Sequence, residues 1–360
     1  MLESGEVFAV AKAFGFAAFF AVNAFLVSYL LACRLLAPSS RLFILDHPNE
    51  RSLHDQPTPR GGGIAIAAGI FLGGVAVGIA YGQDRSLSWL ALGAGIILVV
   101  SFLDDRFEVP PFFRLAVHFL AAVLLAYHGF SMNAFELPGV RWVLAPSVGL
   151  MLSSLFLVWL VNLYNFMDGM DGFAAGMAVI GFGTFAVLGG FAGSDSFTTL
   201  SLVIAAAAGG FLLVNFPPAR IFMGDVGSSL LGLFAAALSL WANREGIFPL
   251  WVGILVFSPF IVDATVTLLR RAVAGERVWQ AHKTHFYQRL VQLGWGHRRT
   301  VLWEYALMVA CGLSAILVHD VAPTLQWLTL GGWMLVYLGL IRLVGWLESP
   351  KHPVSQQPRG

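Results

Sequence analysis

The 360-residue sequence has few charged side chains: Asp, Glu, Lys and Arg make up 11% of it, whereas a typical soluble domain has about 25%. Its formal net charge is only +1, which gives no basic surface for a nucleic acid. The only cysteines, Cys33 and Cys311, lie inside apolar runs and are expected to be small packing residues. These shortages argue against a soluble domain, a nucleic-acid partner and a structural disulfide.

Apolar residues are abundant: they make up 58% of the chain, and the mean hydropathy is +0.78. They recur in runs near 20 residues, the length of a membrane-spanning helix. The sequence therefore predicts an all-α polytopic membrane protein, with one integral domain over residues 1–348 and a disordered tail over 349–360. Eleven spans are expected, near 13–36, 63–81, 87–103, 112–130, 146–163, 173–191, 200–215, 226–241, 247–269, 301–319 and 324–346.

The basic residues are divided unequally between the two sets of connecting loops. Only Lys12, Arg85, Arg141 and Arg244 fall on the side of the N-terminus, and the other 17 Lys and Arg residues fall on the opposite side. The positive-inside rule makes the second side cytoplasmic. We therefore expect a protein of the bacterial inner membrane, with its N-terminus in the periplasm and its C-terminus in the cytoplasm.

Five polar segments fall on the predicted cytoplasmic side. They are residues 41–63, 104–106, 162–172, 215–225 and 270–299. Because a chance gathering of five unrelated loops on one face is improbable, the sequence predicts one shared site.

The central segment, 162–172, carries two carboxamides and two carboxylates, those of Asn162, Asn165, Asp168 and Asp171. Desolvating such groups at a membrane helix end is costly, and oxygen ligands suit a hard cation that accompanies an anionic ligand. Asn, Asp and Gly also form ordinary turns. Four oxygen-bearing side chains are more than a turn needs, so this segment is predicted to be the centre of the site.

Two further segments offer carboxylates. Asp104 and Asp105 are adjacent and would repel each other unless a cation lies near; the alternative is a solvated helix end paired with Arg106 or Arg114. The segment 216–229 reads as a turn into a helix, where free N–H groups can bind phosphate. Asp225 there is a candidate metal ligand and Phe222 a face for a base, although an N-cap Asp beside a loop Phe is the simpler account.

The remaining two segments supply cations. In a helix, His282, His285 and Arg289 would share one face and suit a diphosphate or a sugar; zinc is an alternative that lacks a third ligand and a Glu.

The first loop offers Arg51, His54 and Arg60 before a glycine hinge, or else a lipid-headgroup anchor. Asp263, inside the ninth span, either supports the site or pairs helices.

Four motifs carry a resemblance to a known family: Asp-Asp at 104–105, Asn-x-x-Asn-Phe-Met-Asp-Gly-x-Asp-Gly at 162–172, Phe-Met-Gly-Asp-x-Gly-Ser at 222–228 and His-x-x-His-x-Tyr-Gln-Arg at 282–289. Over residues 41–289 the chain resembles the polyprenyl-phosphate N-acetylhexosamine-1-phosphate transferases, whose superfamily includes phospho-MurNAc-pentapeptide translocase. The last motif is similar to that of the bacterial amino-sugar branch and lacks the triple-His run of the translocases.

The resemblance implies transfer of a sugar 1-phosphate from a UDP-N-acetylamino sugar to undecaprenyl phosphate, with release of UMP. It implies Mg²⁺, with Mn²⁺ as an alternative, and contact with membrane lipids; a homodimer is compatible with it. The product would initiate a cell-envelope polysaccharide such as lipopolysaccharide O-antigen. A translocase-type enzyme of peptidoglycan synthesis is the second interpretation.

The family also implies residue roles. Asp225 with Asn165 or Asp168 would hold the metal, and Phe222 would stack on uracil. Asn215 and Asp171 would contact the nucleoside, and Asn162 belongs to the same substrate-binding set. His282, His285 and Arg289 would face the sugar and diphosphate. The catalytic set would be Asp104, Asp105 and Asp168, the first two being either a base or a nucleophile.

Two other classes remain open. An ion-coupled transporter would place acids at mid-depth, whereas here all but Asp263 gather at the predicted cytoplasmic ends. A lipid-binding scaffold would need no metal constellation. Within the transferase interpretation, we expect direct attack by the lipid phosphate, because a phosphate monoester with a second pKa of about 6 is largely dianionic at pH 7.

Overall fold

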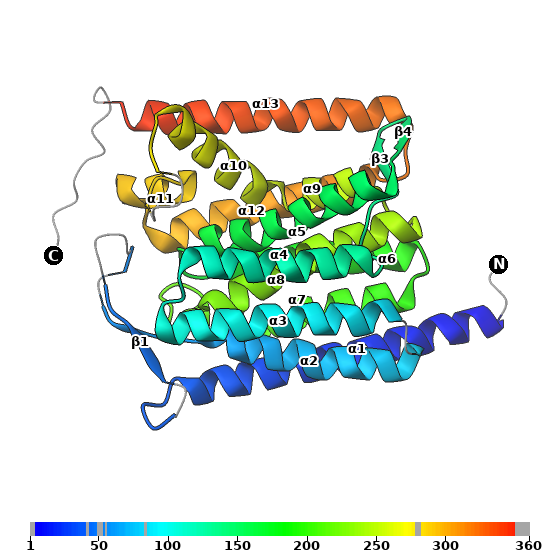
Figure 1. Cartoon of the computed structure of the whole chain (residues 1–360), viewed down its shortest axis with the longest axis horizontal. Coiled ribbons are helices and arrows are strands. Elements are labelled where there is room, and N and C mark those ends of the chain that lie inside the picture. The colour runs from blue at the N-terminus through cyan, green and yellow to red at the C-terminus, as the bar shows by residue number, and fades with distance from the viewer. Residues whose placement is uncertain are drawn as a thin grey trace.

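The computed structural model describes residues 4–40, 43–48, 53–54, 56–82, 85–277 and 282–349, with side chains from residue 16 onward. Long helices lie side by side in one bundle (Figure 1). The helices are α1 (Ser4–Leu35), α2 (Gly62–Tyr81), α3 (Arg85–Phe107), α4 (Pro111–Tyr127), α5 (Pro146–Met167), α6 (Phe173–Phe191), α7 (Asp195–Asn215), α8 (Asp225–Glu245), α9 (Leu250–Val256), α10 (Ser258–Val273), α11 (Phe286–Leu290), α12 (Gly296–Val318) and α13 (Pro323–Leu347), with a π-helix, Val291–Trp295, before α12.

The strands within the described ranges form only two small antiparallel hairpins. One pairs β1 (Ile44–Asp46) with β2 (Thr58–Arg60), and the other pairs β3 (Ala134–Leu137) with β4 (Val140–Val143). The predicted all-α membrane fold is therefore confirmed.

Membrane-spanning length and apolarity are met by nine helices of the described chain, and by a tenth if α9 and α10 count as one span. The shorter α4, with 17 residues, takes the place of the predicted fourth span. The predicted ninth span over 247–269 is not a single straight helix, because the chain bends by 81° between α9 and α10. Pro259, in the first turn of α10, has no N–H to continue the hydrogen-bond ladder of α9.

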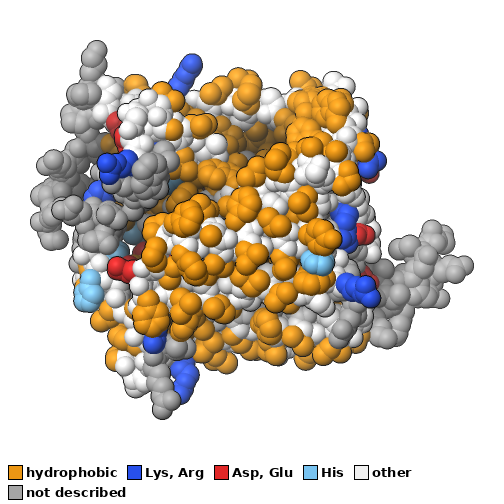
Figure 2. Space-filling model, in the orientation of Figure 1, with side chains coloured by type: hydrophobic (Ala, Val, Ile, Leu, Met, Phe, Trp, Pro, Cys, Tyr) orange, Lys and Arg blue, Asp and Glu red, His pale blue; other side chains and the backbone are white. Residues whose placement is uncertain are grey.

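The bundle is organised around α8. Every residue from Val226 through Ala242 is buried, whereas α13 buries only Gln326 and Val344. Hydrophobic side chains cover the middle of the visible face, and charged side chains gather toward its two ends (Figure 2). This distribution is the one expected for a bundle whose middle lies in hydrocarbon.

Close backbone contact joins α2 to α8 at the end that carries the site. A methyl group on Gly63 would lie 2.1 Å from the backbone nitrogen of Gly227, so neither helix could approach the other with a larger residue there. The strand β2 continues this contact: Arg60 forms a parallel bridge with Phe222, and the N–H of Phe222 donates to the carbonyl of Pro59 at 2.8 Å. The same interaction places the Arg60 side chain beside the first residue of α8.

The described residues of the five polar segments predicted to share one face do lie at one end of the bundle, the end at which α13 finishes (Figure 1). Helix α1 begins at the opposite end. Which end faces the cytoplasm stays a prediction from the basic residues. The predicted tail, apart from Ser349, lies outside the described residues.

Replacement of Gly63 by Ala is expected to lower the melting temperature of the detergent-solubilised protein, because overpacking typically costs about 1–3 kcal/mol and backbone cannot move aside as a side chain can. Gly74→Ala is the matched control in the same helix, since a methyl group there would meet nothing within 4 Å. It should leave the melting temperature unchanged or raise it slightly. Equal melting temperatures for the two variants would contradict the described contact.

Candidate active site

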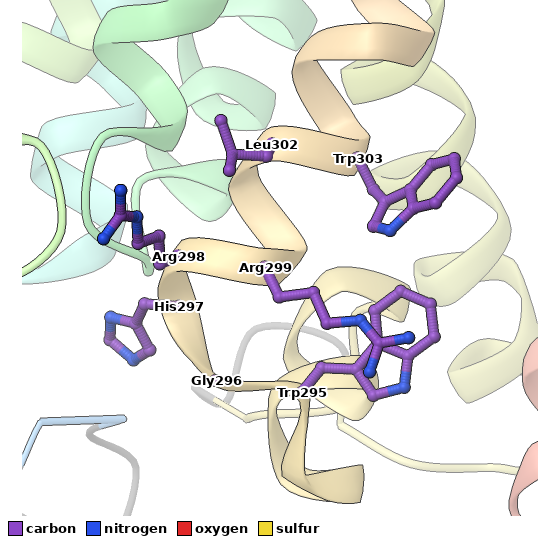
Figure 3. A pocket seen from close by; sticks show the side chains of 7 residues that line it. All are labelled: Trp295, Gly296, His297, Arg298, Arg299, Leu302 and Trp303. Atoms are coloured by element: carbon purple, nitrogen blue, oxygen red, sulfur yellow. The ribbon is translucent and has the colours of Figure 1, made fainter.

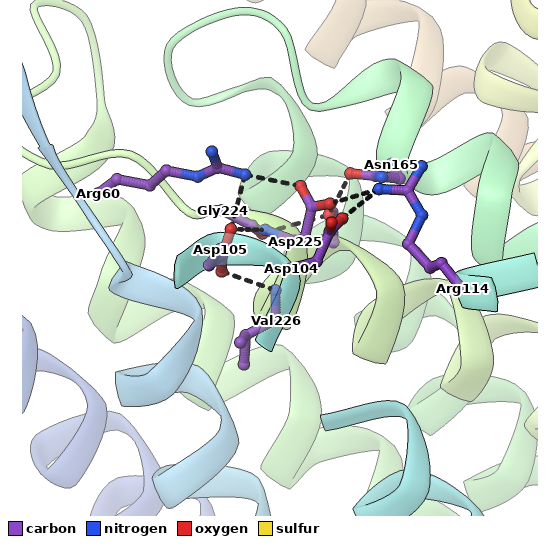
Figure 4. A network of polar contacts seen from close by, with 9 residues as sticks. Arg60, Asp104, Asp105, Arg114, Asn165, Gly224, Asp225 and Val226 are labelled. Atoms are coloured by element: carbon purple, nitrogen blue, oxygen red, sulfur yellow. Dashed lines mark hydrogen bonds and ion pairs between the residues drawn. The ribbon is translucent and has the colours of Figure 1, made fainter. Parts of the chain in front are cut away.

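Asp225, the first residue of α8, is held between two arginines (Figure 4). Arg60 Nη2 lies 2.8 Å from Oδ1 of Asp225, and Arg114 Nη1 lies 2.9 Å from Oδ2. Arg60 also bonds Asp105 Oδ1 at 2.6 Å, and Arg114 bonds Asp104. The five side chains alternate in charge along one chain of ion pairs, which compensates the cost of withdrawing them from water.

Asp105 fixes the start of α8. Its two oxygens accept hydrogen bonds from the backbone N–H groups of Asp225, at 3.0 Å, and Val226, at 3.3 Å. The N–H groups of a first helical turn have no partner within the helix, and a carboxylate there is favoured. Gly224, at φ 76°, makes room, since a methyl group on it would lie 2.9 Å from Asp105 Oδ2. Asp105 therefore acts on Asp225 through the backbone as well as through Arg60.

A cavity of about 360 Å³ opens beside Asp225. Eight of the residues that the sequence singled out line it: His54, Arg60, Asn165, Asp168, Asp171, Asn215, Phe222 and Asp225. The remaining lining residues are Asp46, Leu53, Gly169, Met170, Met223, Gly224, Gln288 and His297. Segments that are far apart in the sequence thus meet around one space large enough for part of a ligand.

Asp168 has an uncompensated carboxylate in this cavity. It follows the last residue of α5, and within the described part of the chain it makes no side-chain hydrogen bond or ion pair. Burial, and then the nearby charge of Asp225, raise the pKa of Asp168 well above its usual value, although Arg60 opposes the shift. A cation close to Asp168 would stabilise the ionised form.

The charge of the cavity lining also calls for a cation. Among the described residues, the lining has four aspartates, Asp46, Asp168, Asp171 and Asp225, and a single arginine, Arg60. An anionic diphosphate would be repelled by this surface unless a cation bound with it.

The donor set fits Mg²⁺. Magnesium is commonly held by one or two carboxylates together with substrate phosphates, and Asp225, Asp168 and the amide oxygen of Asn165 all line the cavity. Asn165 Oδ1 accepts a hydrogen bond from Ser228 at 2.9 Å, which orients the amide. No three His, Cys, Asp or Glu side chains of the described residues are grouped to close a metal site on their own. A metal ion held here would therefore need further oxygens from a ligand, and the described residues give no zinc site at His282 and His285.

Two residues that are predicted to contact the nucleoside, Asn215 and Asp171, hold the connection between α5 and α6 to the loop before α8. Asn215 Oδ1 accepts from the N–H of Gly172 at 2.9 Å, and its amide donates to the carbonyl of Ile221 at 2.8 Å. Asp171 Oδ2 accepts from the N–H of Ala219 at 3.0 Å. These contacts hold Asp171 and Asn215 at the cavity wall.

Phe222 and His54 form an aromatic part of the same wall. Their ring centroids lie 4.7 Å apart with the planes at 61°, and His54 Nε2 lies 3.9 Å from Asp46. The backbone of Phe222 is fixed by its bridge to β2. An apolar, held ring face of this kind can stack on a planar base.

The histidine segment differs from the expectation. His282, His285 and Arg289 do not share a helix face, because α11 begins only at Phe286. Gln288, in the first turn of α11, accepts a hydrogen bond through its Oε1 from the N–H of His285 at 3.2 Å. Of this segment, it is Gln288 that lines the cavity.

The two histidines and the arginine have other partners. His285 is buried, with Nδ1 3.1 Å from Asp263 Oδ1. Asp263 also accepts hydrogen bonds from the N–H groups of Phe286 and Tyr287, at 3.0 and 3.1 Å. Of its two predicted roles, Asp263 therefore fills the supporting one, since it holds this segment in place. Arg289 binds Glu348, with Nε 2.6 Å from Oε1.

His282 lies outside the cavity as well. Burial, then the charges of His285 and Arg271, lower the pKa of His282 to about 4, so its imidazole is neutral at pH 7.

Two predicted substrate residues remain. Asn162 donates to the carbonyl of Val158 in its own helix at 2.8 Å and does not line the cavity. Arg51 lies outside the described residues.

Sequence reasoning missed Arg114, Gln288 and His297 as site residues. The sequence suggests Arg114 only as a partner of Asp104 at a solvated helix end, yet the turn at Pro110 and Pro111 brings the end of α3 beside the start of α4 and so places Arg114 on Asp225. The two glycines around Trp295 were the only local signal that the chain turns back toward the cavity at His297.

The sequence is similar to those of known transferases. The sequence pattern of glycosyl transferase family 4 matches residues 87–243. A protein of Bacillus subtilis named as a probable undecaprenyl-phosphate N-acetylglucosaminyl 1-phosphate transferase is 33% identical, over 83% of this chain and 85% of its own length. A decaprenyl-phosphate N-acetylglucosaminephosphotransferase of Mycolicibacterium smegmatis is 32% identical, over 84% of this chain and 82% of its own.

A phospho-N-acetylmuramoyl-pentapeptide-transferase of a Mycobacterium species is 33% identical, over 76% of this chain and 86% of its own length. Asp104, Asp105, the 162–172 segment and Asp225 all lie within residues 87–243, the span that the family 4 pattern matches. On these similarities, which extend over most of its length, the chain belongs to glycosyl transferase family 4.

Proposed function

We propose that the protein transfers an N-acetylhexosamine 1-phosphate from a UDP-sugar to a polyprenyl phosphate and releases UMP. The observation that carries the proposal is the cavity at one end of the membrane bundle, where Asp225, Asp168 and Phe222 meet from separate segments. Relatives named for transfer of N-acetylglucosamine phosphate to undecaprenyl and decaprenyl phosphate support it. N-acetylglucosamine is accordingly the first sugar to test.

The cavity offers places for the nucleoside and the diphosphate of the sugar nucleotide. Phe222 and His54 provide the face for uracil, and Asp171 and Asn215 stand at the same wall for the nucleoside. The diphosphate would lie toward Asp225 and Arg60.

Asp225, Asp168 and Asn165 would hold Mg²⁺, which when bound neutralises diphosphate charge and polarises the phosphorus–oxygen bonds. Mn²⁺ has the same preference for oxygen ligands.

The reaction is a direct displacement. An oxygen of the lipid phosphate attacks the phosphorus that carries the sugar, and the bond from that phosphorus to the bridging oxygen breaks, so that UMP leaves with the bridging oxygen. The acceptor is largely dianionic at pH 7, so no base is needed to remove a proton. Transfer of this kind depends mainly on positioning and charge neutralisation.

The chain's own residues supply that positioning. Asp105 sets the start of α8 and therefore the position of Asp225. Arg60 and Arg114 lie on opposite oxygens of Asp225 and are placed to share their charge with the two phosphate groups. Asp104 holds Arg114, which does not line the nucleotide cavity and toward which the lipid phosphate would approach.

The reacting end of the bundle is proposed to face the cytoplasm of a bacterial inner membrane, because the loops there carry most of the basic residues. Membrane lipids would then surround the apolar middle of the bundle. Two further points stay predictions: that the lipid product initiates a cell-envelope polysaccharide such as O-antigen, and that the protein forms a homodimer.

The purified protein is expected to release UMP from a UDP-N-acetylamino sugar only when both polyprenyl phosphate and Mg²⁺ are present. Removal of the metal with a chelator should abolish release, and added Mg²⁺ or Mn²⁺ should restore it. A panel of UDP-sugars, assayed for UMP and for the lipid product, identifies the sugar. Absence of release across the whole panel would favour a transporter or a lipid-binding scaffold.

Replacement of Asp225 by Asn is expected to lower turnover about a hundredfold or more, since metal stabilisation of the transition state contributes several kcal/mol. His282→Gln should cost less than tenfold, because a histidine with a pKa of about 4 is neutral at pH 7, as glutamine is. For the same reason the pH profile of the His282 variant between pH 5.5 and 8 should parallel that of the wild type. The reverse order of losses would show that the metal assignment to Asp225 is wrong.

Direct displacement predicts that no covalent bond forms between an aspartate and the transferred sugar phosphate. Incubation with the UDP-sugar and Mg²⁺ in the absence of polyprenyl phosphate should release no UMP, and mass spectrometry of peptides containing Asp104 and Asp105 should show no added sugar phosphate. A trapped sugar-phosphate adduct on either residue would establish a two-step route instead.

A further inference from the structure

The chain makes a sharp turn immediately before α12, and this turn brings His297 to the nucleotide cavity. Gly294, at φ 89°, and Gly296, at φ 70°, are the neighbours of Trp295 in the chain. Figure 3 shows the turn from Trp295 through Gly296 to His297. A positive φ is accessible to glycine without strain, so the π-helix can end and α12 can begin within two residues. His297 then lies in the first turn of α12 and lines the cavity with Asp171 and Phe222.

Helix α12 holds the connection between α5 and α6 at two points. His297 Nδ1 lies 3.1 Å from Asp171 Oδ1, and two turns further along α12 the hydroxyl of Tyr305 donates to the carbonyl of Gly172 at 2.6 Å. Gly176 provides the space for Tyr305, because a methyl group there would lie 2.0 Å from its ring. The position of His297 is therefore set by packing as well as by its pairing with Asp171.

Asp171 is constrained from two sides. Its Oδ1 faces His297, and its Oδ2 accepts from the N–H of Ala219 in the loop that leads to Phe222. A carboxylate with a defined orientation at a cavity wall presents only hydrogen-bond acceptors to a ligand.

Such an acceptor distinguishes pyrimidine bases. Uracil has an N–H donor at N3, whereas neutral cytosine has a lone pair there, which a carboxylate repels. A site built around a required donor discriminates strongly against an analogue that lacks it, and here the N3 lone pair of cytosine would face a carboxylate that has only acceptors.

We propose that His297 is a positioning residue for nucleotide specificity: it holds Asp171 at the cavity wall so that the carboxylate accepts from uracil and rejects cytosine. The inference rests on the proposed function, since it assigns the base-reading part of the same site. It adds a residue outside the four sequence motifs.

Replacement of His297 by Ala is expected to weaken UMP binding, measured by calorimetry with the detergent-solubilised protein, by about tenfold, as for loss of a hydrogen bond to a charged group. CMP binding should change less, so the preference for UMP over CMP should fall. In turnover assays the KM for the UDP-sugar should rise, while kcat and the KM for polyprenyl phosphate stay close to wild type.

Conservative variants separate positioning from folding. Asparagine places its amide near the Nδ1 position of histidine and glutamine places it near Nε2, so His297→Asn should retain most of the UMP preference and His297→Gln should lose it. Arg299→Ala is the matched control, because Arg299 lies over the Trp295 ring, 4.1 Å from its centroid, and points away from His297 (Figure 3). The control should bind UMP as the wild type does.

An unchanged preference for UMP over CMP in both the Ala and Gln variants would overturn the role of His297. A fall in kcat together with a rise in both KM values, with the preference for UMP over CMP intact, would also overturn the role of His297, because it would indicate a general distortion of the site. If His297→Ala does not fold, the comparison of Asn with Gln decides. Failure of the proposed function is a different result: the wild-type protein would release no UMP from any UDP-sugar.

Discussion

The site depends on the compensation of carboxylates that lie at the end of a membrane bundle. Asp105, Arg60, Asp225, Arg114 and Asp104 form one alternating chain of ion pairs, and its members come from α3, β2, α8 and α4. Removing one partner from a buried pair typically costs about 3–5 kcal/mol, because the other charge is left uncompensated. The same interactions that fix Asp225 for chemistry therefore also hold four segments together, so the site and the fold are stabilised jointly.

The apolar runs were sufficient to predict the membrane class and the general order of the spans, because hydrocarbon imposes one length on every crossing helix. They could not predict the break at Phe257. Pro259 was visible in the sequence, but a proline within an apolar run can kink a helix, break it or begin a new one, and the choice is made by the neighbouring helices. The α9–α10 bend of 81° is thus a tertiary property.

The site residues show a similar division. Asn165, Asp168, Asp171, Asn215, Phe222 and Asp225 could be picked from the sequence because oxygen-bearing and aromatic side chains are conspicuous beside apolar runs, and they do line one cavity. The histidine segment could not be interpreted in the same way, because the spacing argument assumed a helix that begins four residues too early. His285 was chosen as a ligand contact, yet it is buried on Asp263, and Gln288 faces the cavity. Arg114 and His297 reach the site because of turns before α4 and α12. Residue types alone do not predict which distant side chains such turns bring together.

The contact between Gly63 and Gly227 has a consequence for how such transferases can be recombined. The peptide around residues 59–63 and the peptide around 222–227 meet backbone to backbone, and the strand β2 bridges them through Arg60 and Phe222. Two homologous chains spliced between these segments would join surfaces that had not co-adapted, at the point with the least tolerance for added atoms. A functional chimera should therefore inherit both peptides from the same parent, even though some 160 residues of sequence separate them.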